Sequence, residues 1–186
     1  MNTRHSRNVQ SSFLNIVAST GLLALGLAAS PLSLAQSTLP DTIKVPAGNK
    51  LVLETVGAGL ITYECKDKKD GAGQEWVFAG PDATLTDRKG KAVGKYYGPP
   101  ATWESKDGSK VTATQLAIAP NGNGNIPLQL VKANPASGEG AMQGVTYIQR
   151  LATKGGTGPA STCDEASKGK KETVGYQADY LFWKAE

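Results

Sequence analysis

The stretch that decides the fold is Tyr176-Gln177-Ala178-Asp179-Tyr180-Leu181-Phe182-Trp183, close to the end of the 186-residue chain. Apolar residues occupy every second position, and this period of two is typical of a half-buried β-strand. Residues 51–56, 61–65 and 145–151 show the same alternation. Outside the N-terminal region, no stretch shows a sustained helical period, so the sequence predicts an all-β domain.

Turn residues separate the alternating stretches. Asp107-Gly108 is the residue pair typical of a two-residue type I′ hairpin, and Lys89-Gly90 is expected to turn a second one. Gly57 and Gly59 are interpreted as a turn between two strands. We therefore predict a single-domain antiparallel β-sandwich of about eight to ten short strands with glycine-rich turns. The alternative is a partly open β-barrel.

Residues 1–35 have the pattern of an export signal. Two arginines precede an apolar stretch from Phe13 to Ala29, and Ser33-Leu34-Ala35 presents small residues to signal peptidase. The apolar stretch falls short of the ~20 residues that a membrane span needs. We expect cleavage of this signal, a domain over residues 36–186, and a periplasmic or extracellular location without a stable membrane span.

The expected export also bears on the two cysteines, Cys65 and Cys163. An even number of cysteines in an oxidising compartment predicts a structural disulfide, and two cysteines alone make a poor zinc site. The only histidine, His5, lies in the signal, so the domain has none for Ser-His-Asp or Cys-His catalysis. No metal and no cofactor are expected. Loss of the two signal arginines lowers the net charge from +4 to +2, which does not predict nucleic-acid binding.

Three aromatic residues gather beside two prolines in Tyr96-Tyr97-Gly98-Pro99-Pro100-Ala101-Thr102-Trp103. Rigid rings offer a flat apolar surface to sugars and other small molecules at little cost in side-chain entropy. Tyr96, Tyr97 and Trp103 are therefore the candidate ligand-binding residues, although Trp103 also fits a core position at the start of a hairpin. We expect a non-catalytic, monomeric exported protein that binds a small molecule, a glycan or an envelope component.

The alternative function is a carboxylate-based hydrolase of envelope or extracellular polysaccharide. Such an enzyme needs two acids about 5–9.5 Å apart, and the acids within predicted strands are Glu54, Glu64, Glu104 and Asp179. The loop Asn121–Asn125 is a further candidate, for a calcium site. It offers only amide and carbonyl oxygens, whereas calcium prefers carboxylates.

Two charges lie in the most distinctive strands. Arg150 shares a face with Ile148, opposite Tyr147 and Leu151, and Asp179 lies opposite the aromatic row of its own strand. A charge among partly apolar neighbours is costly unless it is paired. We therefore predict that both charges are partly buried and that at least one has an ionic or backbone partner. If their strands are neighbours, the two charges can form an ion pair with each other. A structural role is expected rather than a catalytic one, because arginine stays protonated.

Several motifs together resemble one secreted family. The most specific is Gly144-Val145-Thr146-Tyr147-Ile148-Gln149-Arg150, and the others include Tyr63-Glu64-Cys65, Trp76-Val77-Phe78, Trp103-Glu104 and Tyr176-Gln177-Ala178-Asp179-Tyr180. The family is domain-of-unknown-function 3455, found in bacteria and fungi. It has no established activity, so the resemblance implies no reaction. Relatives often carry a histidine where this chain has Tyr96, and a role of that histidine does not transfer here.

Overall fold

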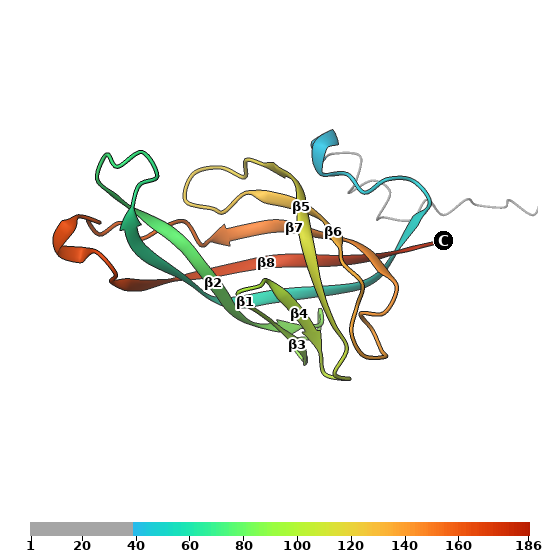
Figure 1. The fold of residues 1–186 in the computed structure, drawn as a ribbon. Helices are drawn as coiled ribbons and strands as arrows, with labels where there is room; N and C mark the ends of the chain where they lie inside the picture. The colour runs from blue at the N-terminus through green and yellow to red at the C-terminus, as the bar shows by residue number, and fades with distance from the viewer. Residues whose placement is uncertain (1–38) are drawn as a thin grey trace, which may run out of the picture.

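The computed structural model describes residues 39–186, whose eight strands form one antiparallel sheet that closes on itself (Figure 1). Successive strands are hydrogen-bonded neighbours, and β1 pairs with β8 as well as with β2. The predicted signal at residues 1–35 lies outside the described residues. The strands are β1 Asn49–Asp67, β2 Gln74–Thr86, β3 Ala92–Tyr97, β4 Thr102–Ser105, β5 Lys110–Ala119, β6 Leu128–Ala133, β7 Val145–Gly155 and β8 Lys171–Ala185.

The predicted all-β antiparallel fold is confirmed. Each strand has a hydrogen-bonded neighbour on both sides, so the strands form a closed ring rather than two stacked sheets. This arrangement corresponds to the barrel alternative, in a closed rather than a partly open form. Helix is confined, within residues 39–186, to two short 3-10 segments at Asp41–Ile43 and Glu165–Ser167. None of the helices in this range is long and apolar enough to cross a membrane.

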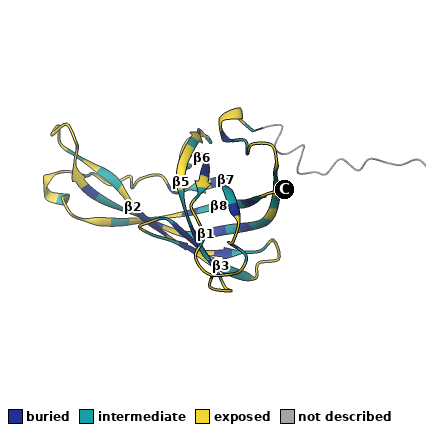
Figure 2. Ribbon diagram, turned by 45° about the vertical axis from the view of Figure 1, so that its right-hand side comes forward, coloured by how far each residue is buried: buried dark blue, intermediate teal, exposed yellow. Residues whose placement is uncertain are grey.

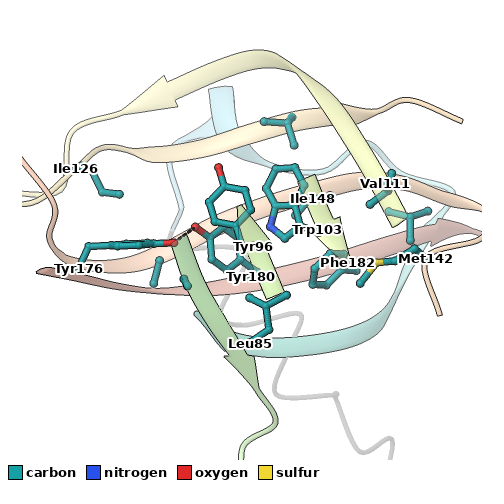
Figure 3. Packing of buried hydrophobic residues seen from close by; sticks show 14 of the residues in the cluster. Leu85, Tyr96, Trp103, Val111, Ile126, Met142, Ile148, Tyr176, Tyr180 and Phe182 are labelled. Carbon is teal, nitrogen blue, oxygen red and sulfur yellow. Dashed lines mark hydrogen bonds between the residues drawn. The ribbon is translucent and has the colours of Figure 1, made fainter. Parts of the chain in front are cut away.

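The aromatic row of β8 faces the barrel interior, as its alternation predicted. Tyr176, Ala178, Tyr180 and Phe182 are all buried and belong to the main core, which rings and aliphatic side chains from the other strands complete (Figure 3). A closed sheet of eight strands leaves an interior that side chains can just fill. The buried residues accordingly follow the strands, while the loops are mostly exposed (Figure 2).

A second core lies outside the barrel, under the segment at residues 39–45, which we call the strap. Its Ile43 and Val45 pack with Trp183 and with apolar side chains of β5 and β6. The Gln149 side chain is buried and links the strap to β8. Its Nε2 donates to the Ile43 carbonyl at 2.7 Å, and its Oε1 accepts from Trp183 Nε1 at 3.1 Å. Because of the strap, β7 and β8 carry apolar residues on both faces.

β1 is one strand of 19 residues. The prediction of two strands joined by a turn at Gly57 and Gly59 is therefore wrong. Both glycines lie inside the strand, where neighbouring groups come too close for a side chain. A Cβ at Gly57 would lie 2.5 Å from Cε2 of Tyr180, and one at Gly59 would clash with the Asp82 carbonyl oxygen. Glycine in a strand interior here marks a close approach rather than a turn.

Both predicted hairpins are present, joining β2 to β3 and β4 to β5. The β4–β5 hairpin is not of type I′, because Gly108 has a φ of +89° while Asp107 does not have a positive φ. The Ser105 N–H donates to the Ser109 carbonyl, so three residues form the loop. The Asp107 carboxylate closes it by accepting from Ser109 Oγ at 2.6 Å, Ser109 N at 2.9 Å and Ala141 N at 2.7 Å.

The predicted disulfide between Cys65 and Cys163 is confirmed. It joins β1, near its end, to the connection between β7 and β8. Backbone hydrogen bonds reinforce this junction, from Cys65 N to the Lys170 carbonyl at 2.9 Å and from Gly169 N to the Cys65 carbonyl at 2.8 Å.

Removal of the disulfide by the double substitution Cys65→Ala and Cys163→Ala is expected to lower the free energy of unfolding by about 2–5 kcal/mol. The reason is that the bridge constrains a long stretch of the unfolded chain, with a sequence separation of 98. Urea denaturation of the two proteins measures the difference. Non-reducing peptide mapping should recover one linked peptide pair, and two freely alkylated cysteines in protein purified from its native compartment would contradict the bridge.

Asp107 is expected to make stability depend on pH. The hydrogen bonds from Ser109 Oγ and from the amides of Ala141 and Ser109 hold its pKa well below the usual value. A carboxyl with a lowered folded-state pKa adds stability above its unfolded pKa, near 3.9, and loses that contribution as the pH falls. Asp107→Ala should therefore lower Tm at pH 7, and the difference from wild type should shrink toward about pH 2.

The matched control for this measurement is Glu139→Ala, which removes an exposed carboxylate that forms no ion pair or hydrogen bond within residues 39–186. Its Tm should stay close to wild type at both pH values. A Tm difference for Asp107→Ala that is the same at pH 7 and pH 2 would show that the carboxylate does not supply the effect.

Candidate functional site

A pocket of about 390 Å³ reaches into the barrel interior and is the candidate site. Small-molecule sites typically enclose about 300–1,000 Å³. The ring of strands is closed, but the pocket lies where its wall is low, because β3 and β4 are only 6 and 4 residues long. Residues 74–81 of β2 therefore pair only with β1, and β5 beyond Thr112 pairs only with β6. Phe78 and Gln115 line the pocket from these two unpaired edges.

Aromatic rings form much of the pocket wall. Tyr96 on β3 stacks on Trp103 on β4, with ring centroids 4.5 Å apart and an interplanar angle of 21° (Figure 3). Tyr63 on β1 and Phe78 on β2 form an edge-to-face pair with centroids 6.1 Å apart. The two pairs give the pocket flat apolar surfaces from four strands.

Two of the three predicted ligand-binding residues, Tyr96 and Trp103, line this pocket, and the third does not. Tyr97 points to the other face of β3, where its hydroxyl donates to Glu104 Oε2 at 2.8 Å. Tyr96 and Trp103 also belong to the main core. Trp103 therefore occupies the expected core position and also lines the pocket.

Arg150 is the one charged side chain in the pocket lining. Its guanidinium donates to the Pro127 carbonyl from Nε at 3.1 Å and from Nη2 at 3.0 Å. The predicted partial burial and backbone partner are thus both present. Within residues 39–186, no aspartate or glutamate forms an ion pair with this guanidinium.

The face predicted for Arg150 needs correction. Arg150 does lie on the same face as Ile148, but this is the interior face, whereas Tyr147 and Leu151 point outward and pack with the strap cluster. A register shift after Val145 puts that residue in the interior as well. Alternation alone does not identify the core row of β7, because the strap covers the outer row and makes it apolar as well.

Asp179 lies on the outer face of β8 and pairs with Arg88, Oδ2 to Nη2, at 2.9 Å. Arg88 also contacts Glu54, Nε to Oε2, at 3.1 Å. Asp179 is therefore partly buried and paired as predicted, although not with Arg150. The other two acids considered for hydrolysis, Glu64 and Glu104, pair with lysines. None of the four acids lines the pocket.

A further part of the wall comes from the loop that precedes β6, which includes the candidate cation loop Asn121–Asn125. Asn121 Nδ2 donates to Thr153 Oγ1 at 2.8 Å, and Thr153 Oγ1 donates to the Ile126 carbonyl at 2.5 Å. The Gly155 amide donates to Asn125 Oδ1 at 2.8 Å. These bonds hold the loop against β7, where it contributes two residues to the pocket, and within residues 39–186 no cluster of His, Cys, Asp or Glu could hold a metal ion.

The hydroxyl groups near the pocket remain protonated at neutral pH. Burial raises the pKa of the Tyr63 and Tyr96 hydroxyls, and the charge of Arg150 acts against this rise. Unlike the hydroxyls of Tyr63 and Tyr176, that of Tyr96 has no hydrogen-bond partner among residues 39–186. It points away from the Tyr176–Tyr180 pair (Figure 3). The lining therefore offers donors and one positive charge to a ligand.

The chain belongs to the family described as protein of unknown function (DUF3455), whose model matches residues 46–184. The resemblance of the sequence motifs is thus confirmed. The matched range contains every residue that lines the pocket. No curated protein and no solved structure matches the chain.

The unpartnered hydroxyl of Tyr96 predicts that Tyr96→Phe leaves the free energy of unfolding within about 0.5 kcal/mol of wild type. Tyr63→Phe is the matched change, and it should cost about 1 kcal/mol. The reason is that the Tyr63 hydroxyl donates to the Gly156 carbonyl at 2.7 Å. Urea denaturation of both variants tests this order, and an equal or greater cost for Tyr96→Phe would contradict it.

Proposed function

We propose that this protein is exported and binds a small molecule inside its barrel without catalysing a reaction. The observation that carries the proposal is the pocket of about 390 Å³ with the stacked rings of Tyr96 and Trp103 in its wall. Rings held in place by core packing lose little conformational freedom when a ligand lies against them. The disulfide between Cys65 and Cys163 supports the exported location, because such bridges persist in oxidising compartments.

Burial of the rings favours a small molecule over a polysaccharide chain. A long glycan needs aromatic rings on an open surface, whereas Tyr96 and Trp103 are 5% and 3% exposed. Phe78 is 51% exposed and stands at the unpaired edge of β2, which makes this side the entrance. The pocket lining has no carboxylate, so the geometry gives hydrolysis no acid pair at this site.

A thermal-shift screen with one-ring and two-ring aromatic acids, amides and alcohols tests the proposal. Ligands should raise Tm, since a ligand at 100 times its Kd adds about 2.7 kcal/mol to stability. Ala113→Phe puts a ring into the pocket and should weaken binding at least about ten-fold, by the loss of ligand contacts. Thr114→Phe is the matched control, because the next residue along β5 is exposed and does not line the pocket.

Ligands that bind both variants as tightly as wild type would place the site elsewhere on the protein. A screen in which no compound raises Tm would count against a pocket for small aromatic molecules. Each variant's own Tm without ligand provides the check that it folds.

A further inference from the structure

Within residues 39–186, Arg150 is a positive charge without a counter-ion, in a pocket whose lining is otherwise uncharged. Arg88, the other arginine within residues 39–186, differs from Arg150 in having ionic partners. Arg88 contacts two carboxylates, those of Glu54 and Asp179. Arg150 has only the Pro127 carbonyl, although it is partly buried among apolar side chains. A partly buried guanidinium gains from a negative partner, and here no residue of the described chain supplies one.

The hydrogen bonds of Arg150 leave one edge of the guanidinium open. The Pro127 carbonyl takes the Nε hydrogen and one hydrogen of Nη2. Three of the five N–H donors remain, two on Nη1 and one on Nη2. Donors on two adjacent nitrogens match the two oxygens of a carboxylate. The Pro127 carbonyl also fixes the orientation of the group, so little side-chain freedom is lost when a ligand binds.

We infer that the natural ligand is a small monocarboxylate with a planar apolar body, an inference that rests on the proposed function. Its carboxylate binds the open edge of Arg150, and its body lies against the stacked rings of Tyr96 and Trp103. Both parts of this ligand class have a counterpart in the lining of the same pocket.

The charge of the lining decides in favour of a monocarboxylate over a phosphate ester. A phosphate monoester carries a charge of about −1.5 to −2 near neutral pH and favours several cations, whereas the pocket has a single one. The neighbouring polar groups are the amides of Gln115 and Gln129, which hydrogen-bond to each other at 2.6 Å, and the hydroxyl of Tyr96, which has no partner among residues 39–186. These groups can donate to a carboxylate, and none carries a negative charge that would repel it.

The test compares acids with their uncharged isosteres, using the pairs 2-naphthoate with 2-naphthamide and benzoate with benzamide. Calorimetric titration of the full-length exported protein at pH 7.5 should show each acid binding at least about ten-fold more tightly than its amide. In Arg150→Met the two Kd values should become equal. Arg150→Lys keeps the charge but loses the fork held by Pro127, so the preference should fall several-fold. Arg88→Met, the matched control outside the pocket, should keep the wild-type preference.

The preference for the acid is the ratio of two Kd values measured on the same variant. A change in the stability of that variant therefore does not by itself change the ratio. If Arg150→Met does not fold, the wild-type ratio and that of Arg150→Lys decide. Acids and amides that bind wild type equally, or a preference that survives both Arg150 substitutions, would overturn the inference. If Ala113→Phe still abolishes binding in that case, the proposed pocket stands. No binding of either member of both pairs, together with an empty thermal-shift screen, would overturn the proposed function as well.

Discussion

The ring of Tyr180 lies on Gly57 in the centre of the barrel, and the geometry of the pocket follows from this contact. Since Gly57 has no Cβ, the ring packs directly against β1, where a side-chain atom would approach it to 2.5 Å. The rings of Tyr96 and Trp103 pack on Tyr180, with centroids 5.0 Å and 5.8 Å away, and stack on each other. The interior of an eight-stranded barrel is just wide enough for such filling. The pocket lies next to the stack, beside the short strands β3 and β4.

The same packing explains why a charge can lie at this depth. Burial of an isolated cation is costly, but Arg150 keeps two hydrogen bonds to Pro127 and borders the pocket. Pro127 is in position because the loop before it is tied to β7 through Asn121 and Thr153. The loop therefore has two effects, since it completes the pocket wall and it orients the guanidinium. A structural role for Arg150 and a role in binding are compatible, because the two use different edges of one planar group.

Local pattern in the sequence predicted the all-β fold, the interior row of β8 and the disulfide, since each depends on residue type and spacing alone. Two kinds of information were missing. Gly57 has the signature of a turn, and only the ring of Tyr180, 123 positions along the chain, explains its place inside a strand. The interior face of β7 could not be recognised because the strap makes the outer face apolar as well. For the site, the cluster Tyr96–Trp103 pointed to the pocket, whereas Arg150 and Pro127 reach it through contacts between distant strands and loops that no spacing encodes.

The protonation states of the lining connect the fold with the proposed role. Burial raises the pKa values of Tyr63 and Tyr96, so both hydroxyls keep their protons at neutral pH. The side chains of Gln115 and Gln129 do not titrate. A carboxylate bound here would meet hydrogen-bond donors and a fixed positive charge. Its own negative charge would raise the tyrosine pKa values further, because a like charge disfavours the phenolate. The lining and such a ligand thus reinforce each other's protonation states, as the proposed binding of an anion requires.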